Sequence, residues 1–345
     1  MKNKIIFAGP CSAETEHQVL STAKEIASIN KNIIYRAGIW KPRTRPNCFE
    51  GVGTAGLVWL QKVKSEYGLR TSTEVANAKH VEEALAHGID ILWIGARTTV
   101  NPFSVQEIAD ALKGVDVTVY IKNPVNPDAQ LWVGAIERIQ NAGIKNIGLI
   151  HRGFATYNKS GLRNEPMWQI PIEMGLKFPD LPMICDISHI CGNRELLSGI
   201  AQKAVDIDVD GLMIETHIAP DDAWSDKEQQ ITPRVLNKFL KNIKWREQSG
   251  ILKIDSSLVK MREEINTIDN DILQLIGARM KVAEHIGHLK KENNLPILQI
   301  SRWSEILEKS VRQGEKIGLS DDFIRKYLDA IHIESINKQN KIMNK

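Results

Sequence analysis

Four side chains of the kind that bind metal ions stand in the first 245 residues, three at or just after the end of a short apolar run and the fourth in the loop after the last of these runs. They are Cys11, His189, Glu215 and Asp226. One thiolate, one imidazole and two carboxylates form a plausible ligand set for a divalent transition metal. Each residue alone also has an ordinary structural role, since a lone cysteine is usually packed in a core and a loop aspartate usually stabilises a turn. The pattern predicts a metal site only if the fold brings these four runs together.

Cationic side chains follow the intervening runs of the same region. They are Arg36, Lys41, Arg97, Lys122 and Arg152. Cations that point into one opening suit a small, multiply charged anion such as a phosphorylated acid. Scattered over a surface, the same residues would simply be solvated. One carboxylate, Glu74, ends a further run between them.

The elements that carry these residues alternate between β-rich runs and amphipathic helical stretches. Strands are expected at Ile5–Ala8, Ile33–Arg36, Arg70–Glu74, Ile91–Gly95, Val117–Lys122, Asn146–Ile150, Met183–Asp186 and Gly211–Glu215. Helices between them are expected at His17–Ile29, Val52–Lys64, Ala78–Leu85, Gln106–Leu112, Gln130–Ala142 and Leu196–Val205, among others. Near-continuous apolar strands, each followed by a helix, indicate a parallel sheet covered by helices.

Eight such repeats indicate how the sheet closes. Within the α/β class, eight repeats over about 245 residues favour a closed (β/α)8 barrel, the TIM-barrel architecture, at residues 1–246. A doubly wound open sheet is the alternative. In a barrel the carboxyl ends of all strands meet at one face, where active sites lie. The metal-binding and cationic side chains would therefore share one opening.

A small all-α domain with one very long helix is expected after the barrel. Residues 247–254 form a plausible linker, and residues 255–345 show no strand pattern. Helices are expected at Ser256–Lys291, at Ser301–Gln313 and from Ser320 toward the C-terminus. A lone helix of about 36 residues cannot bury its apolar face by itself. We therefore expect a homodimer through the helical domain.

The long helix carries cations that could form a second anion site. Arg279 and Lys290 lie within about 20° of each other around the helix axis. Arg262 is rotated by about 100° and lies about 25 Å away along the axis, so it could reach only the equivalent pocket of a partner. Polar residues of the following helices could join them: Arg302, Ser335 and Gln339. Cations on a helical dimer are usually solvated, so periodicity alone leaves this site open.

Composition argues against several other classes of protein. A net charge of +3 over 345 residues favours neither nucleic acid nor an anionic membrane as partner. No stretch approaches the roughly 18 uncharged apolar residues of a membrane helix. The apolar run Ile5–Ala8 is too short for the core of a signal peptide. The four cysteines show no paired spacing, and without an export signal a cytoplasmic location is expected.

The motifs around the barrel residues resemble those of 3-deoxy-D-arabino-heptulosonate 7-phosphate (DAHP) synthases, in the class that includes sugar-acid phosphate synthases. The matching segments are Gly9–Glu14, Arg36–Thr44, Ile94–Thr99, Ile121–Asn123, His151–Gly153, Asp186–His189, and Glu215 with Ser225 and Asp226. They extend over almost the whole of residues 1–245, and Lys41-Pro42-Arg43-Thr44 is the most specific of them.

This resemblance implies a metal-dependent, aldol-type condensation of phosphoenolpyruvate with erythrose 4-phosphate. The divalent ion, with manganese the first expectation, would be bound by Cys11, His189, Glu215 and Asp226. Phosphoenolpyruvate would be held by Arg36, Lys41, Arg97, Lys122 and Arg152. Erythrose 4-phosphate would be bound by Lys41, Arg43 and Thr44, and Glu74 is expected to orient the water that adds. The alternative is the related synthase that acts on arabinose 5-phosphate, whose substrate loop typically lacks the Lys-Pro-Arg-Thr run.

The helical region resembles the all-helical chorismate mutases. The pattern runs through Leu258–Asp269, Arg279–Lys290, Arg302, Gly314–Ser320 and Glu334–Gln339. It implies a chorismate pocket lined by Arg279, Lys290, Arg302, Ser335 and Gln339, with Arg262 supplied by the partner. The rearrangement to prephenate is pericyclic, so it requires clamping of two carboxylates and stabilisation of the breaking ether oxygen rather than a cofactor. Lys290 and Gln339 suit that oxygen.

Two positions depart from the mutase pattern. Trp303 stands where the family usually has a glutamate that contacts the substrate hydroxyl, and Gln299 stands where an acidic residue is common. A non-catalytic alternative therefore stays open, in which the domain senses prephenate or chorismate, regulates the barrel and holds a dimer together. A binding or scaffold protein built on a degenerate barrel is the remaining alternative.

Overall fold

The computed structural model describes residues 4–41, 49–157, 161–246, 256–298 and 300–344, without the side chains of residues 256–258 and 300–302. The expected linker, residues 247–254, and the substrate-loop residues Arg43 and Thr44 lie outside these ranges. The chain divides into two compact units, Met1–Glu247 and Gln248–Lys345.

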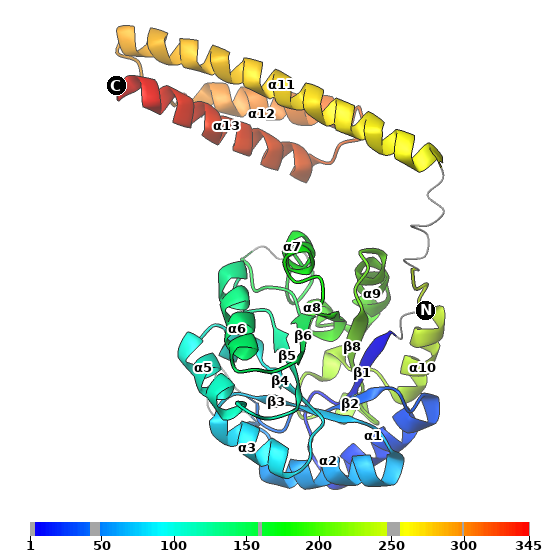
Figure 1. Ribbon diagram of the computed structural model, residues 1–345. Coiled ribbons are helices and arrows are strands. Elements are labelled where there is room, and N and C mark those ends of the chain that lie inside the picture. The colour runs from blue at the N-terminus through cyan, green and yellow to red at the C-terminus, as the bar shows by residue number, and fades with distance from the viewer. Residues whose placement is uncertain (1–3, 42–48, 158–160, 247–255, 299, 345) are drawn as a thin grey trace. The chain divides into compact units, whose positions relative to one another are not determined.

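The first unit is a closed barrel of eight parallel strands in sequence order (Figure 1). The strands are β1 (Ile5–Gly9), β2 (Ile34–Arg36), β3 (Thr71–Val75), β4 (Ile91–Ile94), β5 (Thr118–Lys122), β6 (Asn146–His151), β7 (Met183–Asp186) and β8 (Gly211–Glu215). Pairing of β1 with β8, from Ile5 opposite Gly211 to Gly9 opposite Glu215, closes the sheet. The expected (β/α)8 barrel is confirmed, and the doubly wound alternative is wrong.

Helices surround the barrel. They are α1 (Glu16–Ile29), α2 (Thr54–Tyr67), α3 (Ala78–Ala86), α4 (Ala96–Thr99), α5 (Pro102–Ala111), α6 (Ala129–Asn141), α7 (Gln169–Lys177), α8 (Ile187–Cys191), α9 (Leu197–Asp206) and α10 (Pro233–Asn242), with 3-10 turns at Arg194–Leu196, Pro220–Asp222 and Lys227–Gln229. Side-chain caps begin several of them: Thr15 accepts a hydrogen bond from the backbone of Gln18, and Asn77 from that of His80. The sequence pattern did not reveal α7, whose apolar periodicity is interrupted by Pro171 and Gly175.

The barrel unit has two layers of core. The larger lies between strands and helices, where outward-facing strand residues such as Leu92 and Ile121 are fully buried. The smaller fills the barrel itself and consists of Phe7, Ile34, Ile91, Trp93, Tyr120, Ile150, Ile184 and Met213. Because strand side chains alternate between the two faces, every strand except β3 contributes hydrophobic residues to both layers. The barrel interior is therefore packed, and the chemistry is left to its rim.

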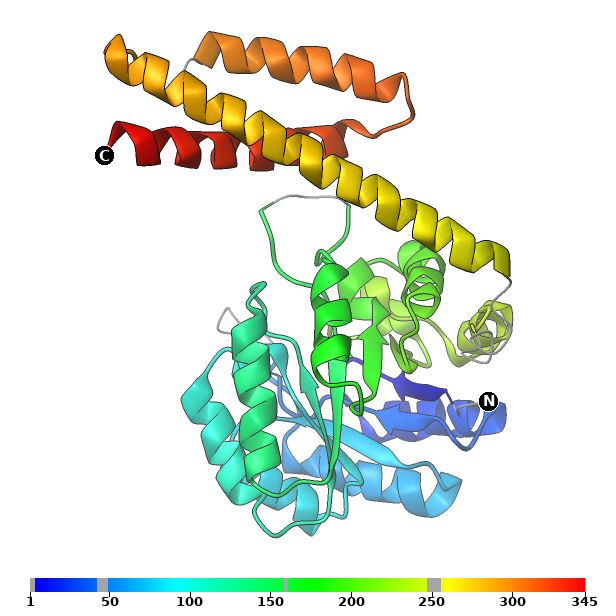
Figure 2. The same ribbon diagram turned by 45° about the horizontal axis from the view of Figure 1, so that its top comes forward.

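The described residues of the second unit form three helices, which Figure 2 shows. They are α11 (Ser256–Glu292), α12 (Ile300–Glu315) and α13 (Asp321–Met343). The fold class expected for this region, all-α with one very long helix, is confirmed. The Ser320 side chain caps α13 by accepting a hydrogen bond from the backbone N–H of Phe323 at 3.3 Å. Within the described ranges, no helix combines the length and apolar character that a membrane span requires.

Candidate active sites

The loops that follow β1 and β8 bring Cys11 and Asp226 together. The two strands are neighbours, and Cys11 Sγ lies 3.1 Å from Asp226 Oδ2. The backbone N–H of Cys11 donates to the side chain of Gln230 at 3.0 Å, and the hydroxyls of Ser12 and Ser225 share a hydrogen bond. These bonds hold the two loops against each other and thereby set the positions of the thiol and the carboxylate.

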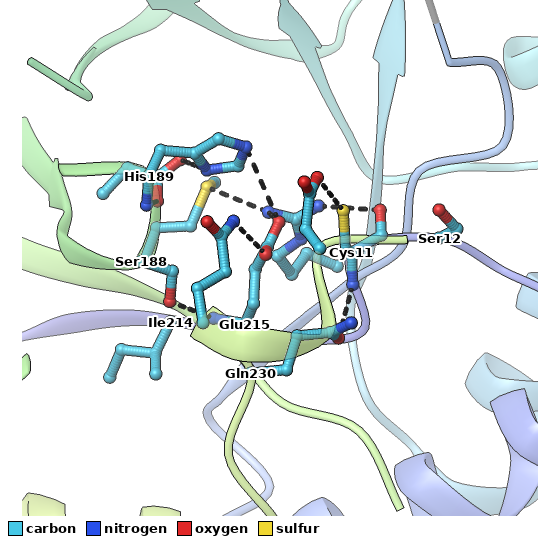
Figure 3. Close-up of polar contacts among 12 residues, drawn as sticks. Cys11, Ser12, Ser188, His189, Ile214, Glu215 and Gln230 are labelled. Atoms are coloured by element: carbon cyan, nitrogen blue, oxygen red, sulfur yellow. Dashed lines mark hydrogen bonds and ion pairs between the residues drawn. The ribbon is translucent and has the colours of Figure 1, made fainter. Parts of the chain in front are cut away.

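His189 and Glu215 form a second pair beside the first. His189, in the short helix that follows β7, places Nε2 3.7 Å from Oε1 of the fully buried Glu215. The other carboxylate oxygen of Glu215 accepts a hydrogen bond from Gln229 at 2.6 Å. Figure 3 shows His189, Glu215 and Cys11 around one part of the barrel rim, with Glu215 at the end of β8 and the other two in the segments that follow β7 and β1. The structure thus gathers all four predicted metal-binding residues at one side of the barrel rim.

Two of the predicted substrate cations contact the predicted metal-binding residues. Arg36 Nη1 lies 3.2 Å from Glu215 Oε1, and Lys41 Nζ lies 2.9 Å from Cys11 Sγ. Across the described residues, no group of three or more His, Cys, Asp or Glu side chains is arranged closely enough to hold a metal ion. The four side chains meet as two pairs rather than as one cluster.

The donor set nevertheless fits a divalent transition metal. Among the described residues, Oε1 of Glu215 is buried and accepts no hydrogen bond, and its only cationic contacts are Arg36 at 3.2 Å and His189 at 3.7 Å, so it keeps a lone pair for a metal ion. Burial, followed by the charge of Glu215, raises the pKa of the Cys11 thiol to about 12. A divalent cation among these groups reverses that effect, because it favours the thiolate over the thiol. Thiolate, imidazole and carboxylates match the preferences of such an ion.

Arg163 reaches Asp226 from the loop between β6 and α7. Its Nη1 lies 2.9 Å from Asp226 Oδ1 and donates to Gln229 at 2.7 Å. Burial alone would raise the pKa of Asp226, but the Arg163 guanidinium lowers it. Arg163 and Asp226 also line a cavity of about 410 Å³ at the rim. The sequence pattern could not reveal Arg163, because it lies in the middle of a loop rather than at a strand end.

Arg36 and Lys122 are buried at the rim above Trp93. The centre of the Arg36 guanidinium lies 5.1 Å from the centroid of the indole ring, and Lys122 Nζ lies 5.7 Å from it. Lys122 also pairs with Asp186 Oδ2 at 2.7 Å. Buried cations without partners are costly, so the carboxylate and the ring hold their charges where a bound anion can meet them.

Asp186 has a structural role that the sequence analysis left unassigned. The fully buried carboxylate at the end of β7 pairs with Lys122 and, through Oδ2, lies 2.8 Å from Nδ1 of His189. It thereby orients an imidazole and a cation at once. A charged residue at the end of an apolar strand was the signal that could have revealed it.

Further cations follow β4 and β6 on the rim. Arg152 follows β6 and donates to Asn164 Oδ1 at 2.8 Å. Burial lowers the pKa of Arg152 to about 10, and the charges of Arg163 and Arg97 act in the same direction against the attraction of Asp186. Arg97 itself lies in α4 and is exposed. The charges of these guanidinium groups thus act on one another, as is expected where a polyanion binds.

Glu74 lies at the same end of the barrel. Its Oε2 accepts a hydrogen bond from Trp93 Nε1 at 3.0 Å. Gly95 lies so close to the Glu74 carboxylate that a Cβ atom at position 95 would come within 2.1 Å of Oε1. The Trp93 indole under Arg36 and Lys122 is therefore hydrogen-bonded to Glu74. The predicted water-orienting residue, Glu74, thus borders the cation site.

The helical unit brings part of the second predicted site together. Arg279 Nη1 of α11 donates to Ser335 Oγ of α13 at 2.5 Å. Lys290 donates to the carbonyl of Ile297 at 2.5 Å. Gln339 is buried, and its Oε1 has no hydrogen-bond partner. Arg262 lies on α11, about 25 Å along the axis from Arg279, and is exposed. The side chain of Arg302 lies outside the described part of the chain.

Comparisons with known proteins place both regions in families. Residues 2–252 match the model of the DAHP synthetase I family, and residues 261–340 match that of chorismate mutase type II. The chain is 28% identical over 239 residues to the phospho-2-dehydro-3-deoxyheptonate aldolase of Thermotoga maritima. The match covers 69% of this chain and 68% of that protein. A crystal structure of a protein of that name and organism superposes with a TM-score of 0.60 at 26% identity, covering 69% of this chain and 67% of the other.

Two further relatives bear on the alternatives. A 2-dehydro-3-deoxyphosphooctonate aldolase of Francisella tularensis is 26% identical over 256 residues, covering 69% of this chain and 90% of that protein. The helical region is 38% identical over 90 residues to the bifunctional chorismate mutase/prephenate dehydratase of Buchnera aphidicola, covering 26% of this chain and 23% of that protein. The chain belongs to the DAHP synthetase I family and carries a chorismate mutase type II domain after its barrel, so it is an enzyme with both activities.

Proposed function

We propose that the barrel condenses phosphoenolpyruvate with erythrose 4-phosphate at the rim where Arg36 and Lys122 lie above Trp93. Enzymes of this family generally depend on a divalent metal. Cys11, His189, Glu215 and Asp226 would hold it, with manganese our first choice, and it would supply Lewis-acid activation of the aldehyde. The observation that carries the proposal is that three cations are paired with acidic groups on one rim: Arg36 with Glu215, Lys41 with Cys11, and Lys122 with Asp186.

The chain's own residues would bind and orient the substrates. Arg36, Lys122 and Arg152, with Lys41 and Arg97, would clamp the carboxylate and phosphate of phosphoenolpyruvate. The enol carbon then attacks the aldehyde, water adds at C2, and phosphate leaves from the hemiketal, with the same cations stabilising the departing anion. Arg43 and Thr44, assigned from the sequence resemblance, would bind the aldose phosphate together with Lys41.

Glu74 would orient the water that adds at C2. Replacing Glu74 with Gln should lower kcat for DAHP formation about 100-fold, because an amide cannot accept the proton. The KM for phosphoenolpyruvate should change little, since the amide oxygen can still accept the hydrogen bond from Trp93. The exposed Glu82→Gln in α3 is the matched control. Full turnover by Glu74→Gln would remove this role.

Assaying the two aldoses side by side tests the substrate. We expect DAHP and phosphate to form from erythrose 4-phosphate, to stop with an exhaustive chelator and to resume on addition of manganese. Preferential turnover of arabinose 5-phosphate would instead place the chain with the 3-deoxyphosphooctonate synthases, to which it is also similar.

The helical domain rearranges chorismate to prephenate, and its family match favours this over the non-catalytic sensor. We assign its pocket to Arg279, Lys290, Arg302, Ser335 and Gln339. The two carboxylates would be held by the arginines, and Lys290 with Gln339 would stabilise the breaking ether oxygen. The cysteines within the described ranges, Cys11, Cys185 and Cys191, are buried and form no disulfide, which supports our proposal of a cytoplasmic location.

We infer a homodimer that places α11 of two chains against each other. Exposed apolar residues recur along α11 at spacings of four and three residues in turn, and only Arg279 replaces an apolar residue in this series. They are Met261, Ile265, Ile268, Ile272, Leu275, Val282, Ile286 and Leu289. This is the heptad spacing of a coiled-coil seam, which buries its apolar residues only against another helix. Arg279 lies within the seam, so the partner could bring its own Arg262 to that pocket.

Mixing two inactive variants tests the shared site. Arg262→Ala and Arg279→Ala should each lose mutase activity as pure proteins. A randomised equimolar mixture should recover about one quarter of wild-type activity, because half the dimers are mixed and each of these has one intact site. Mass measurement of the mixed dimers is the control. Mixed dimers without recovered turnover, or a monomer at micromolar concentration, would contradict the shared pocket.

A further inference from the structure

An aromatic pair lies in the helical unit between α12 and α13. The rings of Trp303 and His332 stack with centroids 4.0 Å apart and planes 16° apart. Stacking on a large indole restricts the imidazole to one orientation. The direction in which the Nε2 atom of His332 points is therefore fixed by the packing of the two helices.

The same face of α13 presents two polar atoms that lack partners. Nε2 of His332 and Oε1 of Gln339 are both buried without a hydrogen bond among the described residues. Seven residues separate them, which is about two helical turns, so they lie on one stripe of α13. Ser335, which receives the hydrogen bond from Arg279, lies between them on that stripe. Because buried polar atoms are rarely left unpaired, these two atoms indicate a ligand that is held along this stripe.

This stripe belongs to the proposed mutase pocket, because Ser335 on it receives the hydrogen bond from Arg279. Burial lowers the pKa of His332, Arg279 and Lys290 lower it further, and Asp329 opposes them. The ring is thus neutral near neutral pH and stands within the field of the two pocket cations. A neutral imidazole can donate or accept one hydrogen bond at Nε2.

We propose that His332 is a further substrate-binding residue of the mutase site, whose Nε2 forms a hydrogen bond with the ring hydroxyl of chorismate. The inference rests on the proposed mutase pocket. Chorismate offers two carboxylates, which suit the arginines, and an ether oxygen, which suits Lys290 and Gln339. Its hydroxyl is the remaining polar group, and a neutral partner suits a neutral group. Trp303 is then a positioning residue that acts through His332.

Two substrates, chorismate and an analogue that lacks the hydroxyl, distinguish the loss of a hydrogen bond from a packing defect. His332→Phe retains an aromatic ring for stacking but removes Nε2. It should lower kcat/KM for chorismate about 3- to 10-fold, the usual effect of one neutral hydrogen bond. With a chorismate analogue that lacks the hydroxyl, the variant and the wild type should be equal. His332→Gln, which restores a polar group without the ring, should recover part of the loss.

Controls use the full chain. His288→Phe, an exposed histidine on the side of α11 about 180° from Arg279, should equal wild type with both substrates. An unchanged kcat/KM in His332→Phe, or an equal loss with both substrates, would overturn the assignment, because the latter is the signature of a packing defect. If the wild type itself does not convert chorismate, the proposed mutase function fails rather than the role of His332 alone.

Discussion

Cys11→Ala should abolish metal-dependent DAHP synthesis while leaving the mutase reaction intact. The Cys11 thiol lies 3.1 Å from Asp226 and 2.9 Å from Lys41, so it stands at the meeting point of the proposed metal ligands and the substrate cations. Loss of a residue that supports a metal ligand weakens metal binding by up to about 100-fold. Loss of a ligand itself should therefore weaken it by at least about 100-fold. Titration calorimetry of the demetallated protein with manganese measures the affinity, and phosphate release measures the reaction.

The chain contains its own controls for this experiment. Cys185→Ala removes an equally buried thiol of strand β7 that faces the core between the strands and the helices. It should retain manganese binding and synthase turnover. Prephenate formation in the same samples reports on the helical domain. Full synthase activity by exhaustively demetallated Cys11→Ala would show that the four residues do not form the catalytic centre.

Lys290→Ala should lower kcat for prephenate formation by about 100- to 1,000-fold. In a pericyclic rearrangement no group is deprotonated, so the enzyme acts by stabilising charge on the breaking ether oxygen, and a single well-placed donor has effects of this size. Because Lys290 already donates to a backbone carbonyl of its own unit, the ammonium is held in place before substrate binds. Stopped assays of chorismate loss with wild type and variant measure the change.

Lys281→Ala is the matched control, since this lysine is exposed on the same helix. Its mutase activity should equal that of wild type, and both variants should retain DAHP synthesis. A Lys290→Ala protein with wild-type turnover would remove this residue from the site. A wild type that binds prephenate tightly without converting chorismate would restore the sensor alternative.

The sequence by itself determined the barrel and most of its rim. Alternating apolar strands and helices carry the information for a (β/α)8 fold locally, and a charged residue at the end of an apolar strand can point only to the rim. That is why Cys11, Arg36, Lys122 and Glu215 could be assigned before any contact was known. Helical periodicity likewise placed Arg279 and Lys290 on one face.

Only the tertiary structure decided which side chains share a partner. Asp186 bridges His189 and Lys122, Arg163 reaches Asp226 across two loops, and Trp303 stacks on His332 from another helix. These contacts join residues that are far apart in the chain, so no local period encodes them. They depend on barrel closure, on helix packing and on the rotamers that packing allows, which are properties of the whole fold.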